Sequence, residues 1–244
     1  MRQAMSRMKI QTLIKWLPVV AALTMQGAFA DGGVSFSRNR MVFPATEKAI
    51  TLTVTNHGSG PYLVQAGVSG TPEGKGGAPF MVTPPMFRLE GKGENVMRIL
   101  RTGGALPADR ESVFYFYANT IPGQAGPAAA GGAVLSISMR TVLKLFWRPD
   151  GLKMKPDEAP EKLVFEATRD GVTVKNPTPY YQSFAQLQFD GHDEDLNRVP
   201  SMVAPFGELH IPLTKSVHRA VWSVMNDYGG VSATQRAAVR EGSH

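Results

Sequence analysis

The most informative stretch of the chain is residues 134–149, Val-Leu-Ser-Ile-Ser-Met-Arg-Thr-Val-Leu-Lys-Leu-Phe-Trp-Arg-Pro. Leu135, Ile137 and Met139 alternate with polar residues at its start, and the stretch then becomes almost continuously apolar around Lys144. A period of two predicts a β-strand with one polar face. The Gly/Ala-rich segment 123–133 precedes it. A strand introduced by such a segment is typical of a sheet edge that accepts a strand from another chain.

The rest of the chain also alternates with a period of two. Apolar residues alternate with threonines over 50–54, and the alternation resumes over 62–68 after the turn-rich segment 56–61, which predicts a hairpin. Residues 113–118 are aromatic and alternating, which predicts a central strand. Short strands at intervals of about ten residues, separated by Gly- and Pro-rich turns, predict an all-β chain built from antiparallel sandwiches.

The sequence divides into four segments. Residues 1–30 place four basic residues before an apolar segment that ends in Ala28-Phe29-Ala30, which predicts a cleaved signal peptide and export. The apolar part is shorter than the roughly 20 residues that a membrane-spanning helix needs. Composition changes after the Pro-containing connection 148–151. We therefore expect a first β-domain over 31–150, a second over 151–233 and a disordered tail over 234–244.

Composition and spacing argue against several classes of function. Four of the 26 basic residues and none of the 20 acidic ones lie in the predicted leader, so the net charge falls from +6 to +2 and gives no case for nucleic-acid binding. The absence of cysteine excludes disulfides, thiol catalysis and cysteine-zinc sites. The five histidines lack the spacing of a metalloprotease, and Gly74-Lys75 is followed by glycine rather than by the Ser or Thr of a phosphate loop. We expect neither an enzyme nor a cofactor or metal site.

Seven short motifs occur in the order seen in the periplasmic pilus-assembly chaperones, and from about Val34 to Gly230 the chain resembles this PapD-like family. The motifs are Asn39-Arg40-Met41-Val42-Phe43, Thr83-Pro84-Pro85 with Arg88-Leu89, Asp109-Arg110-Glu111-Ser112, Ile121-Pro122, Lys144-Leu145-Phe146-Trp147-Arg148-Pro149, Asn176-Pro177-Thr178-Pro179-Tyr180-Tyr181 and Asn226-Asp227-Tyr228-Gly229-Gly230. The resemblance implies two immunoglobulin-like β-sandwich domains in an L- or boomerang-shaped arrangement. It also implies a periplasmic chaperone that binds fimbrial subunits and delivers them to an outer-membrane usher.

In that family the subunit is a sandwich that lacks its last strand, and the chaperone lends one. The resemblance places the donor strand at about 134–148, with Leu135, Ile137 and Met139 filling the groove of the subunit. The alternative is that these three side chains pack into the chain's own core. The missing cysteines and the modest length of segment 123–133 favour the short-loop branch of the family. The sequence leaves open whether the free protein self-associates through this strand.

The resemblance also assigns charged residues. Arg40 and Lys144 match the two cations that hold the terminal carboxylate of the subunit, whereas the alternative for each is an internal salt bridge or a solvated side chain. Arg38 shares the parity of Arg40, but Arg40 fits the family register. An inter-domain ion network is matched by Glu111, Arg148 and Asp227.

A second reading of the chain is a secreted β-sandwich that is itself a structural or adhesive subunit of a surface fibre. Such a subunit is expected to carry an N-terminal extension of alternating residues that it donates to its neighbour. Only Asp31-Gly32-Gly33 separates the predicted cleavage site from the first predicted strand. This shortness favours the chaperone over the fibre subunit.

Overall fold

The computed structural model describes residues 33–123 and 136–242. The predicted signal peptide, Leu135 and nearly all of segment 123–133 lie outside the described residues. The described chain consists of β-strands and two short 3₁₀ helices, which confirms the all-β prediction. None of its helices has the length and apolar character needed to cross a membrane.

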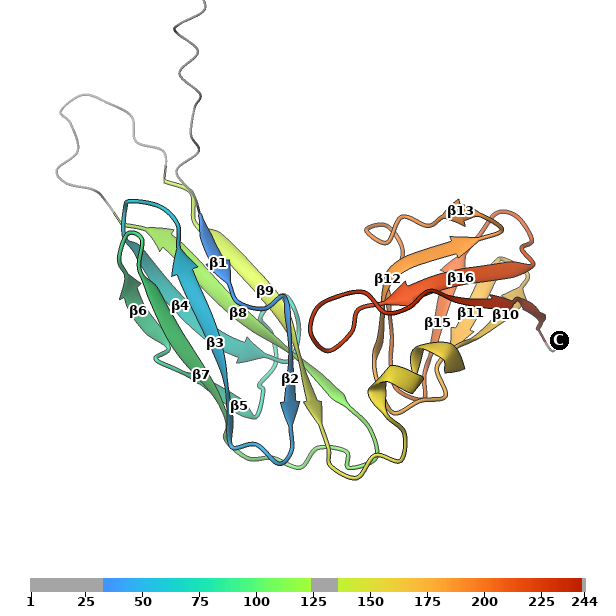
Figure 1. Ribbon diagram of the computed structural model, residues 1–244, viewed down its shortest axis with the longest axis horizontal. Helices are drawn as coiled ribbons and strands as arrows, with labels where there is room; N and C mark the ends of the chain where they lie inside the picture. Colours follow the sequence, from blue (N-terminus) through green and yellow to red (C-terminus); the bar gives the residue numbers. More distant parts are fainter. Residues whose placement is uncertain (1–32, 124–135, 243–244) are drawn as a thin grey trace, which may run out of the picture. The chain divides into compact units, whose positions relative to one another are not determined.

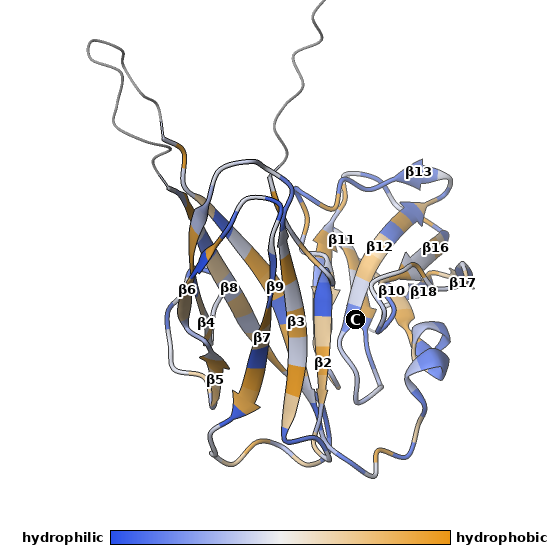
Figure 2. Ribbon diagram, turned by 60° about the vertical axis from the view of Figure 1, so that its left-hand side comes forward, coloured by the Kyte–Doolittle hydropathy of each residue, from blue (hydrophilic) through white to orange (hydrophobic). Residues whose placement is uncertain are grey.

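The first sandwich consists of two sheets that enclose one apolar core (Figure 1). One sheet has the order β1–β3–β7–β5, with bounds Val34–Phe36, Ala49–Asn56, Glu94–Arg101 and Phe80–Thr83. The other has the order β2–β9–β8–β4–β6, with bounds Arg40–Pro44, Met139–Arg148, Ser112–Pro122, Tyr62–Ser69 and Met86–Leu89. Alternate side chains point inward, and in Figure 2 β3 shows the corresponding alternation of apolar and more polar residues. The aromatic strand β8 is central, as predicted.

The hairpin predicted over residues 50–68 is wrong. Strand β3 pairs with β1 and β7 in one sheet, whereas β4 pairs with β6 and β8 in the other. The buried side chain of Asn56 fixes the segment in which the chain passes from one sheet to the other. Its Nδ2 donates to the carbonyls of Gly60 (2.8 Å) and Glu90 (3.0 Å), and its Oδ1 accepts from the N–H of Gly58 (2.9 Å). Alternation identifies two strands but does not identify the partner of either.

The N-terminal strands leave part of one sheet edge unpaired. Strand β1 pairs with β3, and the chain then changes sheets, so that β2 pairs in parallel with β9 from Arg40 opposite Lys144 to Pro44 opposite Arg148. On its other side β9 pairs with β8 over residues 139–147. Because β2 begins opposite Lys144, no strand among the described residues pairs with residues 139–143 on the side away from β8. We call this side of residues 139–143 the open edge.

The second sandwich has its own core, in which Phe165 and Trp222 pack with ring centroids 4.6 Å apart. One sheet has the order β15–β11–β10–β18, with bounds Glu208–Pro212, Gly171–Lys175, Val164–Thr168 and Arg240–Glu241. The other has the order β13–β12–β16–β17, with bounds His192–Asp193, Gln182–Phe189, Arg219–Val224 and Gln235–Ala238, and β14 (Met202–Val203) also pairs with β12. The 3₁₀ helices η2 (Pro156–Glu158) and η3 (Pro160–Lys162) precede it.

The disordered tail predicted over 234–244 is wrong for residues 235–241. Strand β17 pairs with β16, and β18 pairs in parallel with β10. Ala237 and Val239 pack against the core of the second sandwich. Residues 237–239 form one short run of small apolar residues between charged ones, so the segment shows no alternating pattern and its backbone pairing could not be predicted from the sequence.

Candidate functional site

The burial of the side chains of strand β9 changes at Lys144. Beyond it, Leu145 and Trp147 are buried in the core of the first sandwich. Before it, Ile137 and Met139 are each 64% exposed, and Ile137 lies just ahead of the first strand residue. Met139 has the parity of Leu145, so the face that is core at one end of β9 continues into solvent at the other. These two predicted donor side chains are therefore not sealed inside the chain's own sandwich.

Arg40 and Lys144 are brought together as register partners on the parallel strands β2 and β9. Both differ in parity from core residues, so they lie on the face of the sheet away from the first core. The guanidinium of Arg40 lies 4.5 Å above the ring of Phe146, and its Nη1 donates to the carbonyl of Met225 (2.7 Å). Its buried Nε has no acceptor among the described residues.

Neither of these cations forms an ion pair within the described part of the chain. Burial lowers the pKa of Arg40, although the charges of Asp227 and Glu111 act in the opposite direction. Burial and the neighbouring charge of Arg40 lower the pKa of Lys144. Two adjacent, partly desolvated cations without a carboxylate partner are electrostatically suited to bind an anion from another molecule.

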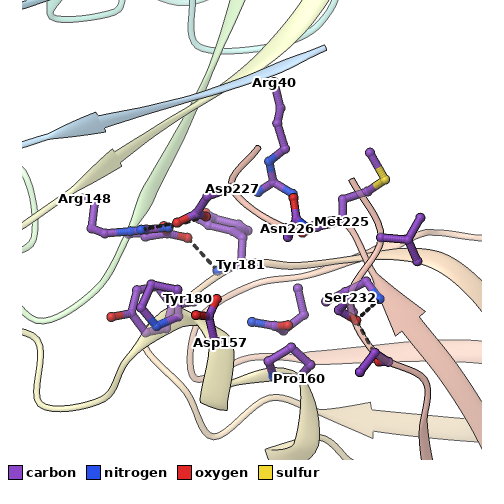
Figure 3. A pocket seen from close by; sticks show the side chains of 16 residues that line it. Arg40, Arg148, Asp157, Pro160, Tyr180, Tyr181, Met225, Asn226, Asp227 and Ser232 are labelled. Carbon is purple, nitrogen blue, oxygen red and sulfur yellow. Dashed lines mark hydrogen bonds and ion pairs between the residues drawn. The ribbon is translucent and has the colours of Figure 1, made fainter. Parts of the chain in front are cut away.

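Arg148 brings the three residues of the predicted ion network together (Figure 3). Its Nε donates to Glu111 Oε1 (2.8 Å), and its two terminal nitrogens donate to the carboxylate of Asp227 at 2.6 and 2.8 Å. The second oxygen of Glu111 accepts the N–H of Tyr181 (2.9 Å). Burial opposes the charge on Arg148, but the hydrogen bonds and ion pairs with Asp227 and Glu111 raise its pKa. The network therefore joins Glu111, just before β8, and Arg148, at the end of β9, to the second sandwich.

A cavity of about 340 Å³ lies beside these residues. Its lining includes Arg40, Glu111, Arg148, Tyr181 and Asp227, and Figure 3 shows the side chain of Arg40 extending toward Met225 at its wall. The cavity thus places one cation of the pair next to the ion network. Lys144 does not line it.

The sequence did not assign roles to Asn39, Tyr181 or Gly229. The side-chain amide of Asn39 donates to the carbonyl of Gly229 (3.0 Å), and the ring of Tyr181 packs against Phe146 at 5.6 Å between centroids. All three occur in the motifs quoted above, so the sequence contained a signal for them. Their roles depend on contacts between distant segments, which the motifs alone do not specify.

Comparison with known proteins agrees with this arrangement. Residues 33–153 match the model of the Pili and flagellar-assembly chaperone, PapD N-terminal domain, and residues 158–236 match the Pili assembly chaperone PapD, C-terminal domain. Chaperone protein FocC of Escherichia coli is 34% identical over 212 residues, covering 85% of this chain and 91% of FocC. Probable fimbrial chaperone protein ElfD of Escherichia coli is 36% identical over 205 residues, covering 83% and 85%.

Solved structures give the same result. The Escherichia coli chaperone DraB has a TM-score of 0.75 at 33% identity, covering 85% of this chain and 97% of DraB. A chain of the Salmonella enterica complex of the SafA pilin with the SafB chaperone has a TM-score of 0.77 at 31% identity, covering 85% and 96%. These relatives are chaperones of fimbriae and pili, which decides against the fibre-subunit alternative. The chain belongs to the PapD family of pilus-assembly chaperones.

Proposed function

We propose that this chaperone acts in the periplasm, which it reaches through the signal peptide predicted over residues 1–30, and that it stabilises pilus subunits by lending them strand β9. The subunit would then pass to an outer-membrane usher. DraB and SafB support the comparison with chaperones, and the SafB chaperone is seen with a pilin. The proposal needs no catalytic step.

The observation that carries the proposal is the open edge of β9. Its backbone groups are available to a strand from another molecule, and Ile137 and Met139 extend the apolar face of the strand into solvent. Pairing with a subunit strand satisfies the backbone groups, while the two side chains fill an apolar groove. Each buried Ile or Met contributes on the order of 1.5–3 kcal/mol before ordering costs. Leu135 would add a third such side chain in the same parity.

The cation pair supplies a fixed end to this interaction. Arg40 and Lys144 lie where the open edge stops, because β2 occupies the edge from Lys144 onward. A strand that runs along the open edge toward Lys144 therefore reaches the cations with its terminus. A terminal carboxylate there would gain charge-assisted hydrogen bonds of about 1.5–3 kcal/mol each and would satisfy the unpaired Nε of Arg40. This end point sets the register of the bound strand.

Co-expression in a bacterial periplasm with the pilus subunits encoded beside this gene tests the cation pair. Arg40→Ala and Lys144→Ala are each expected to leave the chaperone folded and to reduce recovery of the subunit strongly. Arg38→Ala is the matched control, because Arg38 is exposed and lies two residues before Arg40. Full subunit recovery with both Arg40→Ala and Lys144→Ala would refute the carboxylate anchor.

The same assay tests strand donation separately. Ile137→Asp places a charge on the face that should enter the subunit, so the complex should be lost while the chaperone stays folded. Met81→Asp on β5 is the control, because Met81 is a 51% exposed apolar residue on the opposite sheet. Equal subunit yields for the two variants would contradict donation through Ile137.

A further inference from the structure

The second sandwich has a tight turn, residues 225–230, that contacts Arg40. The N–H of Asn226 donates to the carbonyl of Gly230 (2.8 Å), and the side-chain oxygen of Asn226 accepts the N–H groups of Tyr228 (3.0 Å) and Gly230 (2.9 Å). Gly229 has φ = 83°, a conformation that favours glycine. The turn is therefore fixed by its own hydrogen bonds.

Three contacts attach this turn to the first sandwich. The carbonyl of Met225 accepts from Arg40 Nη1 (2.7 Å), and the carbonyl of Gly229 accepts from the Asn39 amide (3.0 Å). Between them, Asp227 forms the bidentate ion pair with Arg148. The approach at Gly229 is close, because a Cβ built on Gly229 would overlap the side-chain amide of Asn39.

We propose that the 225–230 turn is a positioning element for subunit binding, in which Asn39 and Gly229 act as positioning residues for the guanidinium of Arg40. This inference rests on the proposed function, since it concerns how that carboxylate is bound. Asn39 precedes Arg40 in the chain, so its bond to Gly229 fixes the turn beside the same part of β2 that carries Arg40. The second sandwich thereby contributes to carboxylate recognition through a residue of the first.

The donors of Arg40 show what this positioning achieves. A guanidinium has five N–H groups, and the carbonyl of Met225 accepts one of the two on Nη1. The edge formed by Nε and Nη2 is therefore left for another acceptor. Nε is buried and has no acceptor among the described residues. An arginine side chain that is held in one conformation before binding loses less freedom when the carboxylate arrives. Release of the turn should therefore weaken carboxylate binding without removing either cation.

The test compares two forms of one peptide. The probe is a fluorescent peptide that copies the C-terminal strand of the subunit recovered by co-expression, made with a free carboxylate and as its carboxamide. Binding is measured by fluorescence anisotropy to the full mature chain, and thermal melts establish that each variant is folded. Only a change in the carboxylate-to-carboxamide affinity ratio reports on Arg40, whereas general destabilisation lowers both affinities.

Four variants separate positioning from backbone strain. Asn39→Ala removes the bond to Gly229, and Gly229→Ala adds a Cβ that meets Asn39. Gly191→Ala is the matched control, because Gly191 has φ = 87° in the second sandwich and an added Cβ would meet nothing within 4 Å. In the double variant Asn39→Ala/Gly229→Ala the overlap is absent, so it should bind like Asn39→Ala rather than more weakly.

We expect the unchanged protein and Gly191→Ala to prefer the carboxylate by about tenfold or more, and Asn39→Ala and Gly229→Ala to lose most of that preference. A full preference in both turn variants, together with its loss in Arg40→Ala, would overturn the positioning role and leave the proposed function intact. No preference in the unchanged protein would overturn the carboxylate anchor itself. If Gly229→Ala does not fold, the result for Asn39→Ala alone tests the positioning role, because Asn39 is exposed and its replacement should leave the protein folded.

Discussion

The two ends of strand β9 share one alternating pattern and differ in their surroundings. Leu145 lies between β2 and β8 and is fully buried, whereas Met139 pairs only with β8 and is 64% exposed. The difference arises outside β9, where the chain changes sheets between β1 and β2 and leaves residues 139–143 without a second neighbour. One strand can thus complete its own sandwich at one end and offer an edge at the other. Mutations at the two ends should therefore have opposite consequences for stability and binding.

The largest effect is expected at the closed end, from Arg148→Met. This change leaves Glu111, which is 3% exposed, without its counter-charge, and it also removes both bonds to Asp227. Loss of one partner of a buried ion pair costs about 3–5 kcal/mol. Urea unfolding should show this loss, with Arg38→Met as an exposed control. A loss below about 1 kcal/mol would mean that the ion network does not support the closed end.

Leu145→Ala should cost about 2–5 kcal/mol in the free energy of unfolding, because it leaves a cavity in a filled core. The same urea titration measures it. Leu145→Ala should reduce subunit binding only in proportion to the fraction of unfolded chaperone. A variant that remained as stable as the unchanged protein would show that the closed end is not part of the core.

A smaller effect of the opposite sign is expected for Lys144→Met at the boundary between the two ends. The ammonium is partly buried beside Arg40, so its removal should stabilise the free chaperone by at most about 1 kcal/mol while subunit binding is lost. Folding lowers the pKa of Lys144 below its ordinary value of about 10.4. At pH values between these two pKa values the unfolded chain therefore holds more protons than the folded chain. Stability of the unchanged protein should then rise with pH across this window.

The control for this pH dependence is the Lys144→Met variant itself. The difference in unfolding free energy between the two proteins should shrink as the pH rises through that window, because the lysine becomes neutral in both states. A Lys144→Met variant that is less stable than the unchanged protein at low pH, with a deficit that disappears as the pH rises, would show that Lys144 is stabilised by a partner within the free chain.

The smallest effect on stability is expected at the open end. Ile137→Ala should change the free energy of unfolding by less than about 0.5 kcal/mol, because the side chain is mostly in solvent. The same change should weaken the complex with a subunit measurably. A stability loss comparable to that of Leu145→Ala would show that Ile137 packs inside its own sandwich, and the contrast between the two ends would disappear.

The sequence predicted the local structure of these ends better than their pairing. Alternation predicted strands over 50–54, 62–68 and 113–118, because side-chain parity is a local property. It could not show that β3 and β4 belong to different sheets, since nothing local reports which edge a strand meets. The sequence did not predict the C-terminal strand β17, because the apolar residues of this strand are small.

The site was predictable only in part, for the same physical reason. The order of the motifs marked Arg40, Lys144, Arg148 and Asp227, and the alternating start of residues 134–149 predicted a sheet edge. The point at which that edge ends, opposite Lys144, follows from the sheet change before β2, which no motif records. The bond between Asn39 and Gly229 joins residues 190 positions apart. Such a contact depends on both sandwiches being folded, so it appears only when the chain is seen in three dimensions.

Residue-resolved amide hydrogen exchange of the free and subunit-loaded chaperone tests the central claim most directly. The account predicts that the amides of residues 139–143 that do not bond to β8 exchange quickly in the free protein and become strongly protected in the complex. The amides of residues 145–148, which are already enclosed by β2 and β8, should change little. Unchanged exchange along the open edge, with new protection confined to the second sandwich, would contradict strand donation by β9.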